Sequence, residues 1–259
     1  MSSPLTKRLQ SITNKLAPVL AIAVVLLLWL GVTEFEVMPS YMLPSPVDVC
    51  RALISDFGTL MQHASVTLAE AFAGLGIGIL LSFVIATLMD RFSFLYKALY
   101  PLMVITQTIP TVAIAPLLVL WLGFGMAPKI TLVVITTFFP ITVSLLDGYR
   151  SADPDAIALL RSMGAGKLQI FRYIKLPSSI GHFFSGLQVS ASYSVVGAVI
   201  AEWLGGFEGL GVYMTRVRKA YAFDKMFAVI IFIIVVSLLL MLLVSVIKKL
   251  SMPWERKGD

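Results

Sequence analysis

The chain has 259 residues, of which 58% are hydrophobic and only 13% are charged, and its mean hydropathy is +0.92. Soluble domains carry about 45–50% apolar and about 25% charged residues, so this composition excludes an ordinary soluble protein and indicates an all-α integral membrane protein. The formal net charge of +6 raises nucleic acid as a partner. Basic residues also gather in the cytoplasmic loops of membrane proteins, so we expect the lipid bilayer as partner, and no nucleic acid.

Six apolar segments are long enough to cross a bilayer, since a spanning helix needs about 20 apolar residues. They cover residues 16–33, 63–89, 96–122, 128–147, 180–203 and 224–247. We therefore expect one six-span domain at 16–250, between an N-terminal segment at 1–15 and a tail at 251–259. The first run is too long for a secretory leader and no small-residue cleavage site follows it. The distribution of Lys and Arg predicts a multi-pass protein of the plasma (inner) membrane with both termini in the cytoplasm.

Two features precede the third span. Pro46 and Asp48 suit the start of a helix, so we expect a short amphipathic helix at 47–61 along the outer surface. In the second span, Gly74 and Gly78 have the G-x-x-x-G spacing, which predicts close packing against another helix.

The third span contains Pro101, Pro110 and Pro116. Proline removes a backbone donor and bends a helix. In membranes such bends persist where other helices or a water-filled cavity satisfy the freed backbone groups. A transport path beside this span is one interpretation, and a purely structural kink is the other.

Polar side chains within spans are costly and are therefore candidates for a path through the membrane. The candidates of the third and fifth spans are Gln107, Thr111, Gln188, Ser192, Tyr193 and Glu202. Glu70, early in the second span, is a further one. The alternative interpretation is that these groups form hydrogen bonds that hold the helices together.

A charged, helix-prone segment at 155–177 separates the fourth and fifth spans. Asp153 and Pro154 predict a helix start, and Gly164 predicts its stop in a left-handed conformation. A second helix is expected at 167–175, with Leu168, Phe171 and Ile174 on one stripe, ending at Leu176-Pro177. The first helix places Leu159, Leu160 and Met163 on one face, which predicts a docking surface. The alternative is an amphipathic helix lying on the inner leaflet.

The chain contains no G-x-x-x-x-G-K-[ST] loop, so it has no phosphate cradle of that kind. His63 and His182 lie far apart without metal-ligand spacing, so we expect neither a metal site nor a cofactor in this chain. Any energy for transport must come from a partner or from an ion gradient.

The segment ending in Ile174-Lys175-Leu176-Pro177, with Gly164 thirteen residues before the proline, resembles the signature loop of binding-protein-dependent ABC importer permeases. The E-A-A lead of that loop is absent, because residues 158–160 read Ala-Leu-Leu. This departure is similar to the nitrate/sulfonate/taurine-type branch. Further matching pieces lie at 43–46, 107–110, 201–205 and 209–211.

The resemblance implies a type I ABC importer-like fold of six transmembrane helices, with a cytoplasmic coupling loop at 150–177 that docks on a separate ATPase. The residues it implicates are Ala156, Leu159, Leu160, Met163, Gly164, Ala165, Leu176 and Pro177. Implied partners are two ATPase subunits, which bind ATP and Mg, a second copy of this permease and an extracytoplasmic solute-binding protein. Glu202 is expected at the outer end, in contact with the second permease copy or with the solute-binding protein. The chain itself would be no enzyme.

The same resemblance covers substrates such as taurine, nitrate, riboflavin and the pyrimidine precursor of thiamine, and the segment 202–221 is most similar to the vitamin-precursor members. Two other classes stay open. An ion-gradient-driven secondary carrier predicts inverted repeats and charges at the midplane. A membrane-embedded enzyme or scaffold predicts a cluster of His, Asp or Glu at one membrane face, which the two separated histidines do not supply.

Overall fold

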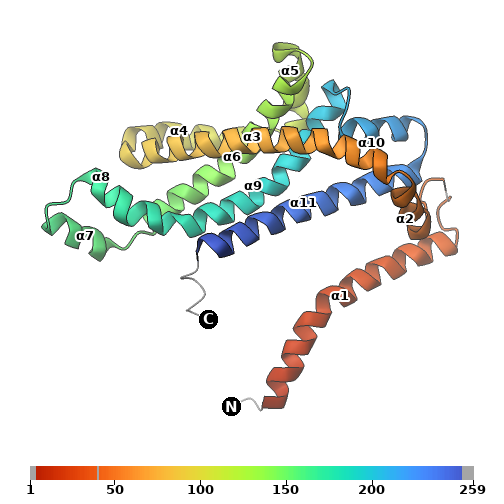
Figure 1. Ribbon diagram of the computed structural model, residues 1–259, viewed down its shortest axis with the longest axis horizontal. Coiled ribbons are helices and arrows are strands. Elements are labelled where there is room, and N and C mark those ends of the chain that lie inside the picture. The colour runs from red at the N-terminus through yellow and green to blue at the C-terminus, as the bar shows by residue number, and fades with distance from the viewer. Residues whose placement is uncertain (1–3, 40, 253–259) are drawn as a thin grey trace.

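The computed structural model describes residues 4–39 and 41–252, and the regular structure in these ranges is entirely helical, which confirms the predicted all-α class. The helices are shown in Figure 1. In chain order they are α1 (Pro4–Glu34), α2 (Pro46–Ser55), α3 (Phe57–Arg91), α4 (Ser93–Thr108), α5 (Thr111–Leu122), α6 (Met126–Arg150), α7 (Pro154–Ser162), α8 (Lys167–Ile170), the π-helix η1 (Phe171–Lys175), α9 (Leu176–Gly205), α10 (Leu210–Lys219) and α11 (Phe223–Ser251).

Helices α6 and α9 form the centre of the bundle, and α3 and α11 pack against them (Figure 1). The core between them includes Ile141, Leu145, Ala191 and Val195, all fully buried. Neighbouring helices pack closely because their contact faces carry small residues.

The predicted close approach at Gly74 and Gly78 is confirmed on the face of α3 that meets α6. A Cβ atom at Gly74 would lie 2.5 Å from the Cβ of Val133, and one at Gly78 would lie 2.5 Å from Oγ1 of Thr137. Only a residue without a side chain fits at either position, so these two glycines set the distance between α3 and α6.

The bend predicted in the third span is present, and it is a full break between two helices. Helices α4 and α5 meet at an angle of 101°, with Ile109 and Pro110 both extended between them. Pro110 causes the break because it lacks a backbone N–H and forces the preceding residue out of the helical region. Pro101 and Pro116 lie inside α4 and α5 without ending either helix. By length and composition the described chain has five continuous spans and this broken pair.

The expected outer helix is present as α2 but ends at Ser55, earlier than the predicted residue 61. Ser45 caps it by accepting a hydrogen bond from the backbone N–H of Asp48. Asp56 leaves the helical conformation and begins α3, while Tyr213 and Lys225 both donate to its carboxylate. Burial opposes the charge on this carboxylate, but those two donors outweigh it and hold the pKa of Asp56 below its usual value. The turn between α2 and α3 is thereby tied to α10 and α11.

Helix α1 lies apart from the bundle (Figure 1). Near its C-terminal end, the ring of Trp29 packs against Phe227 at 5.8 Å, and its indole nitrogen donates to the carbonyl of Pro44. The apolar side chains from Leu16 onward are largely exposed, as with Leu27 at 66%. In a bilayer this surface faces lipid or another chain. The structure starts α1 at Pro4, within the predicted segment 1–15, and part of the predicted tail, residues 253–259, lies outside the described residues.

Candidate functional site

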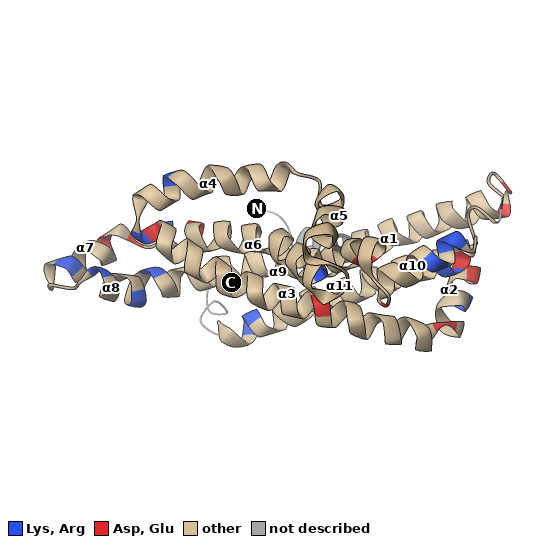
Figure 2. Cartoon of the chain, turned by 90° about the horizontal axis from the view of Figure 1, so that it is seen from above, with Lys and Arg blue, Asp and Glu red and all other residues tan. Residues whose placement is uncertain are grey.

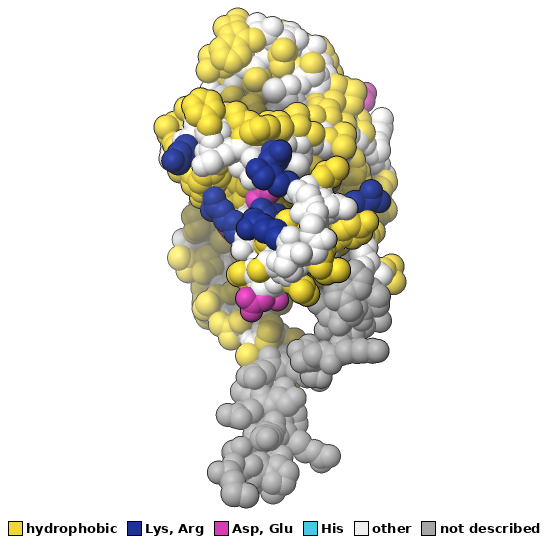
Figure 3. Space-filling model, turned by 90° about the vertical axis from the view of Figure 1, so that its left-hand side faces the viewer, with side chains coloured by type: hydrophobic (Ala, Val, Ile, Leu, Met, Phe, Trp, Pro, Cys, Tyr) yellow, Lys and Arg dark blue, Asp and Glu magenta, His cyan; other side chains and the backbone are white. Residues whose placement is uncertain are grey.

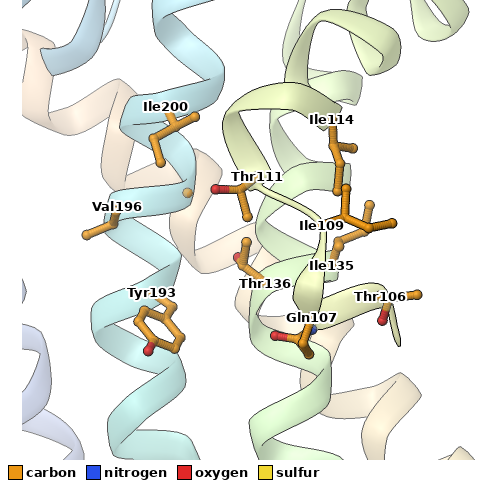
Figure 4. Close-up of a pocket in the computed structure, with 11 residues that line it drawn as sticks. Thr106, Gln107, Ile109, Thr111, Ile114, Ile135, Thr136, Tyr193, Val196 and Ile200 are labelled. Carbon is orange, nitrogen blue, oxygen red and sulfur yellow. The ribbon is translucent and has the colours of Figure 1, made fainter. Parts of the chain in front are cut away.

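A cavity of about 220 Å³ opens beside the break between α4 and α5, against α6 and α9 (Figure 4). Gln107 comes from the last turn of α4, Thr111 from the start of α5 and Tyr193 from α9, so the structure brings three of the predicted path residues together. The complete lining is Thr106, Gln107, Ile109, Thr111, Ile114, Ile135, Thr136, Tyr193, Val196, Gly197 and Ile200. Polar groups of α4 and α5 face α9 across this space in Figure 4.

Sequence reasoning missed Thr136 as a lining residue. It lies on α6, and its hydroxyl donates to the carbonyl of Val133 one turn earlier, which satisfies the hydroxyl hydrogen within its own helix. Its oxygen keeps acceptor capacity toward the cavity. Threonine is common inside spanning helices, so only the position of α6 against the break could have identified it.

Two other candidates lie elsewhere in the bundle. The side-chain amide of Gln188 donates to Oγ of Ser245 at 2.7 Å and so connects α9 to α11. This contact fits the alternative interpretation, in which such groups hold helices together. Ser192 is half-buried and does not line the cavity.

Glu202 neither lines the cavity nor lies at the surface, which corrects the expectation of contact with another chain. Its side chain is buried, at 1% exposure. One carboxylate oxygen accepts from the hydroxyl of Thr67 at 2.7 Å, and the other accepts from the backbone N–H of Gly211 at 2.6 Å. The loop after α9 folds back over this carboxylate, so Glu202 joins α3, α9 and α10 at one point.

A second buried charge, Lys129 at the start of α6, lies in the same region. It donates to Glu70 of α3 at 2.6 Å, and both side chains are almost fully buried. The other oxygen of the Glu70 carboxylate is buried without a hydrogen-bond partner. Sequence reasoning missed this pair because Lys129 stands at the edge of its span. Glu70 within an apolar span was the available indication of such a pair, since a buried charge needs a partner of opposite sign.

The N-terminus of α10 is held from α3 as well as from Glu202. The backbone N–H of Gly209 donates to Nδ1 of His63, and that of Leu210 donates to Oγ1 of Thr67. Gly209 has a φ of +121°, which residues with a side chain rarely adopt, and a Cβ there would collide with the Glu202 carboxylate. The loop can close on the carboxylate only because this residue is glycine.

Replacing Gly209 by alanine is therefore expected to destabilise the protein. Backbone strain alone costs about 1–3 kcal/mol, and the Glu202 carboxylate must also move. Thermal unfolding in detergent measures the effect. The matched control is Gly76→Ala, because Gly76 lies within α3 and a Cβ there meets nothing within 4 Å. That control should be neutral or stabilising, and equal losses in both variants would contradict the role of the Gly209 conformation.

The loop between α6 and α9 contains the predicted first helix as α7. Asp153 accepts from the N–H of Asp155, and Gly164 stops the segment with a φ of +84°. Leu159 and Met163 are 63% and 74% exposed. Of the other residues assigned to coupling, Ala156, Leu160, Ala165 and Leu176 are half-buried and Pro177 is exposed. Their contact with an ATPase stays a prediction.

The second loop helix does not end at Leu176-Pro177, and this prediction was wrong. Helices α8, η1 and α9 run on without a break from Lys167 to Gly205. In the π-turn the N–H of Leu176 reaches the carbonyl of Phe171, and Pro177 follows in the first turn of α9 without ending the helix.

The apolar stripe expected on the second loop helix is divided. Phe171 and Ile174 are half-buried, and the ring of Phe171 lies 5.2 Å from that of Tyr149, whereas Leu168 is 79% exposed. The nearby side chain of Lys175 donates to both carboxylate oxygens of Asp90, at 2.6 and 2.9 Å. These contacts fix the end of the loop to α3 and α6.

Comparison with known proteins agrees with this architecture. The family described as "Binding-protein-dependent transport system inner membrane component" matches residues 74–257. A probable ABC transporter permease protein of Haemophilus influenzae is 37% identical over 225 residues, covering 87% of this chain and 92% of that protein. The formylaminopyrimidine transport permease protein of Halalkalibacterium halodurans is 35% identical over 246 residues, covering 93% of this chain and 97% of that protein. The riboflavin transport system permease protein of Chloroflexus aurantiacus is 28% identical over 256 residues, covering 96% and 95%.

Two solved structures share the fold. An amino acid ABC transporter solved with histidines matches with a TM-score of 0.63 and 16% identity, covering 76% of this chain and 95% of that one. An inward-facing methionine ABC transporter matches with a TM-score of 0.60 and 17% identity, covering 73% and 93%. The family pattern covers most of the chain, and relatives above 30% identity cover nearly all of it. The chain therefore belongs to the binding-protein-dependent inner membrane components, the permease subunits of ABC transporters.

Proposed function

We propose that two copies of this chain, with two ATPase subunits and an extracytoplasmic solute-binding protein, import a small vitamin-precursor heterocycle across the plasma membrane. ATP and Mg would be bound by the ATPase subunits, outside this chain. The family supports ATPase and binding-protein partners, and the copy numbers are part of the proposal. Both termini would lie in the cytoplasm. In support, α11 ends in Figure 1 toward the side from which α7 and α8 project, while α1 ends beside α2 at the opposite end of the molecule.

The cavity beside the α4–α5 break is our candidate for half of the translocation path. It lies where the chain has lost a continuous helix, and in a membrane such a break persists beside protein or a water-filled space. The second copy would supply the facing half. Gln107, Thr111 and Tyr193 would offer an amide and two hydroxyls to the passing solute.

The chemistry of the lining carries the substrate proposal. None of the described residues that line the cavity is charged, and its polar groups are hydroxyls and one amide. Such a lining suits a neutral heterocycle with hydrogen-bonding edges better than a free sulfonate or nitrate, because an anion would lose its hydration without a cation to replace it. A relative named for formylaminopyrimidine is 35% identical, against 28% for relatives named for riboflavin and for aliphatic sulfonates and 26% for one named for taurine.

Reconstitution of the permease with its ATPase and binding protein in liposomes tests the proposal. We expect ATP-dependent uptake of labelled formylaminopyrimidine, and no uptake of labelled taurine or nitrate. Uptake of taurine with no uptake of the pyrimidine would reject the substrate class. Uptake without the ATPase would reject the mechanism.

Replacing Gln107 by leucine should lower pyrimidine uptake about tenfold, because the solute loses one hydrogen-bonding partner in the cavity. The measurement is uptake at matched amounts of assembled transporter. Gln188→Leu is the control, since Gln188 donates to Ser245 and does not line the cavity. The variant Gln188→Leu is expected to alter the stability of the transporter and to leave its preference for the pyrimidine over taurine unchanged. An equal change of preference in both variants would remove the cavity from the path.

A further inference from the structure

A second cavity, of about 480 Å³, lies between the end of α3 and the segment α8–η1. Figure 2 shows α8 at the opposite end of the molecule from α10. The second cavity shares no residue with the first cavity. Its lining is Thr87, Leu88, Asp90, Arg91, Arg161, Lys167, Leu168, Ile170, Phe171 and Lys175. The volume lies within the range of sites that hold small ligands, about 300–1,000 Å³.

The cavity has a strong excess of positive charge. Arg91, Arg161, Lys167 and Lys175 line it, and Asp90 is the one acid among the described lining residues. Asp90 is already paired with Lys175 through both oxygens. Arg161 and Lys167 form no ion pair within the described part of the chain, so their charges are left for a ligand. Figure 3 looks onto this end of the molecule and shows Lys and Arg gathered there with few acids.

These cations face away from the predicted ATPase-docking surface. Arg161 follows Leu159 by two residues and precedes Met163 by two, and each step turns an α-helix by about 100°. Arg161 therefore points about 160° away from both. The exposed pair Leu159 and Met163 looks outward, while Arg161 looks into the cavity toward α3.

Exposed apolar side chains follow Arg91 in the chain, and one of the lining residues, Leu168, is also apolar and exposed. Phe92 and Phe94, directly after α3, are 51% and 79% exposed, and Leu168 of α8 is 79% exposed. The guanidinium of Arg91 lies 5.7 Å from the ring centre of Phe92. Cations above apolar groups at the end of a spanning helix form the pattern found where a membrane-embedded surface meets the headgroup layer.

We propose that this cavity binds the phosphodiester headgroup of an anionic phospholipid of the inner leaflet, with the acyl chains against Leu168 and the Phe92–Phe94 turn. The phosphate of the headgroup would bridge Arg91 at the end of α3 to Arg161 and Lys167 of the loop. It would supply the negative charge that no described residue supplies to these three cations. The inference depends on membrane insertion and not on the transported solute, so it stands or falls separately from the proposed substrate.

The test uses the full chain, purified in detergent and titrated with dioleoylphosphatidylglycerol, dioleoylphosphatidylcholine or inorganic phosphate. Bound lipid is counted by native mass spectrometry, and thermal unfolding is followed in parallel. We expect phosphatidylglycerol to bind and to raise Tm, while phosphatidylcholine and inorganic phosphate leave Tm unchanged. The variant Arg91→Gln/Lys167→Gln should bind phosphatidylglycerol about 30-fold more weakly, since each basic residue near the surface contributes about a factor of five.

The matched control is Lys97→Gln/Arg172→Gln, which removes two exposed charges near the same membrane face but outside the cavity. It should retain phosphatidylglycerol affinity within a few-fold. Arg161→Gln alone, on α7, should cost about fivefold, and it serves if the double variant does not fold.

Three results would overturn the proposal. Equal losses in the double variant and its control would indicate diffuse attraction to the membrane surface. An equal rise of Tm with inorganic phosphate would indicate a site for a free anion. Loss of the ATPase from the double variant at unchanged lipid affinity would assign these cations to the ATPase surface.

Discussion

Replacing Leu159 and Met163 together by aspartate is expected to release the ATPase from the purified permease. Both side chains are exposed, at 63% and 74%, Leu159 on α7 and Met163 directly after it. The resemblance to the importer permeases predicts that they enter a cleft of the ATPase. A buried apolar anchor at an interface contributes about 2 kcal/mol or more, and a carboxylate in its place must also be desolvated. Loss of two anchors lowers the affinity at least about 1,000-fold. Co-purification of the ATPase with the tagged permease measures this directly.

The matched control is Leu168→Asp. Leu168 is 79% exposed and belongs to the same loop, but it lies on α8 and not on α7. This control should retain the ATPase, which separates docking from a general effect of added negative charge. Full retention in the α7 variant would place the docking face elsewhere. The structure selects Met163 over Leu160 for this test, because Leu160 is half-buried against the rest of the chain.

Replacing Lys129 by methionine is expected to lower Tm by about 10 °C. The change leaves Glu70 buried without its cation, close to the buried carboxylate of Glu202. Breaking a buried ion pair from one side costs about 3–5 kcal/mol, and about 2–4 °C of Tm follows from each kcal/mol in a chain of this size. Thermal unfolding of the purified full chain in detergent provides the measurement.

Two comparisons make this result specific. The double variant Lys129→Met/Glu70→Leu removes both charges and should recover most of the loss, which a double-mutant cycle quantifies. Arg51→Met breaks the exposed pair with Asp48, whose side chains are 76% and 50% exposed, and should cost under about 1 kcal/mol. If Lys129→Met shifts Tm no more than Arg51→Met does, the buried pair contributes nothing to stability.

Most of the fold followed from the length of apolar runs. The runs at 63–89, 128–147, 180–203 and 224–247 lie within α3, α6, α9 and α11, because crossing a bilayer is a requirement on length and composition. The break at Pro110 did not follow from it. Pro101 and Pro116 are tolerated inside helices, so a proline in the sequence does not show whether its helix bends or ends.

The family followed from the Gly164–Pro177 spacing, and the comparisons confirm the ABC permease family and its non-catalytic role. The secondary carrier and the enzyme are thereby set aside. The carrier would have intramembrane charges, and Glu70 and Lys129 are such charges, but they pair with each other and lie outside the cavity at the α4–α5 break.

The candidate site could be predicted where local sequence decides it. Gln107 and Thr111 flank the break that forms the cavity, so their closeness to each other can be predicted from their positions in the sequence. Glu202 was misplaced because its partner Thr67 lies 135 residues away, and the return of the loop at 206–211 brings them together. The pairing of Lys129 with Glu70 was missed for the same reason, since the two residues are 59 positions apart in the chain.

The uninterrupted helix Lys167–Gly205 has a mechanical consequence for the transport cycle. At 1.5 Å per residue, its 39 residues follow a path of about 58 Å, from the loop that we predict to meet the ATPase to the buried carboxylate of Glu202. If it tilts about its midpoint as a rigid lever, a rotation of about 5° displaces each end by about 2.5 Å in opposite directions. A movement that narrows the cytoplasmic mouth then widens the outer one, so a single helix can alternate the access of both sides without a hinge at the membrane centre.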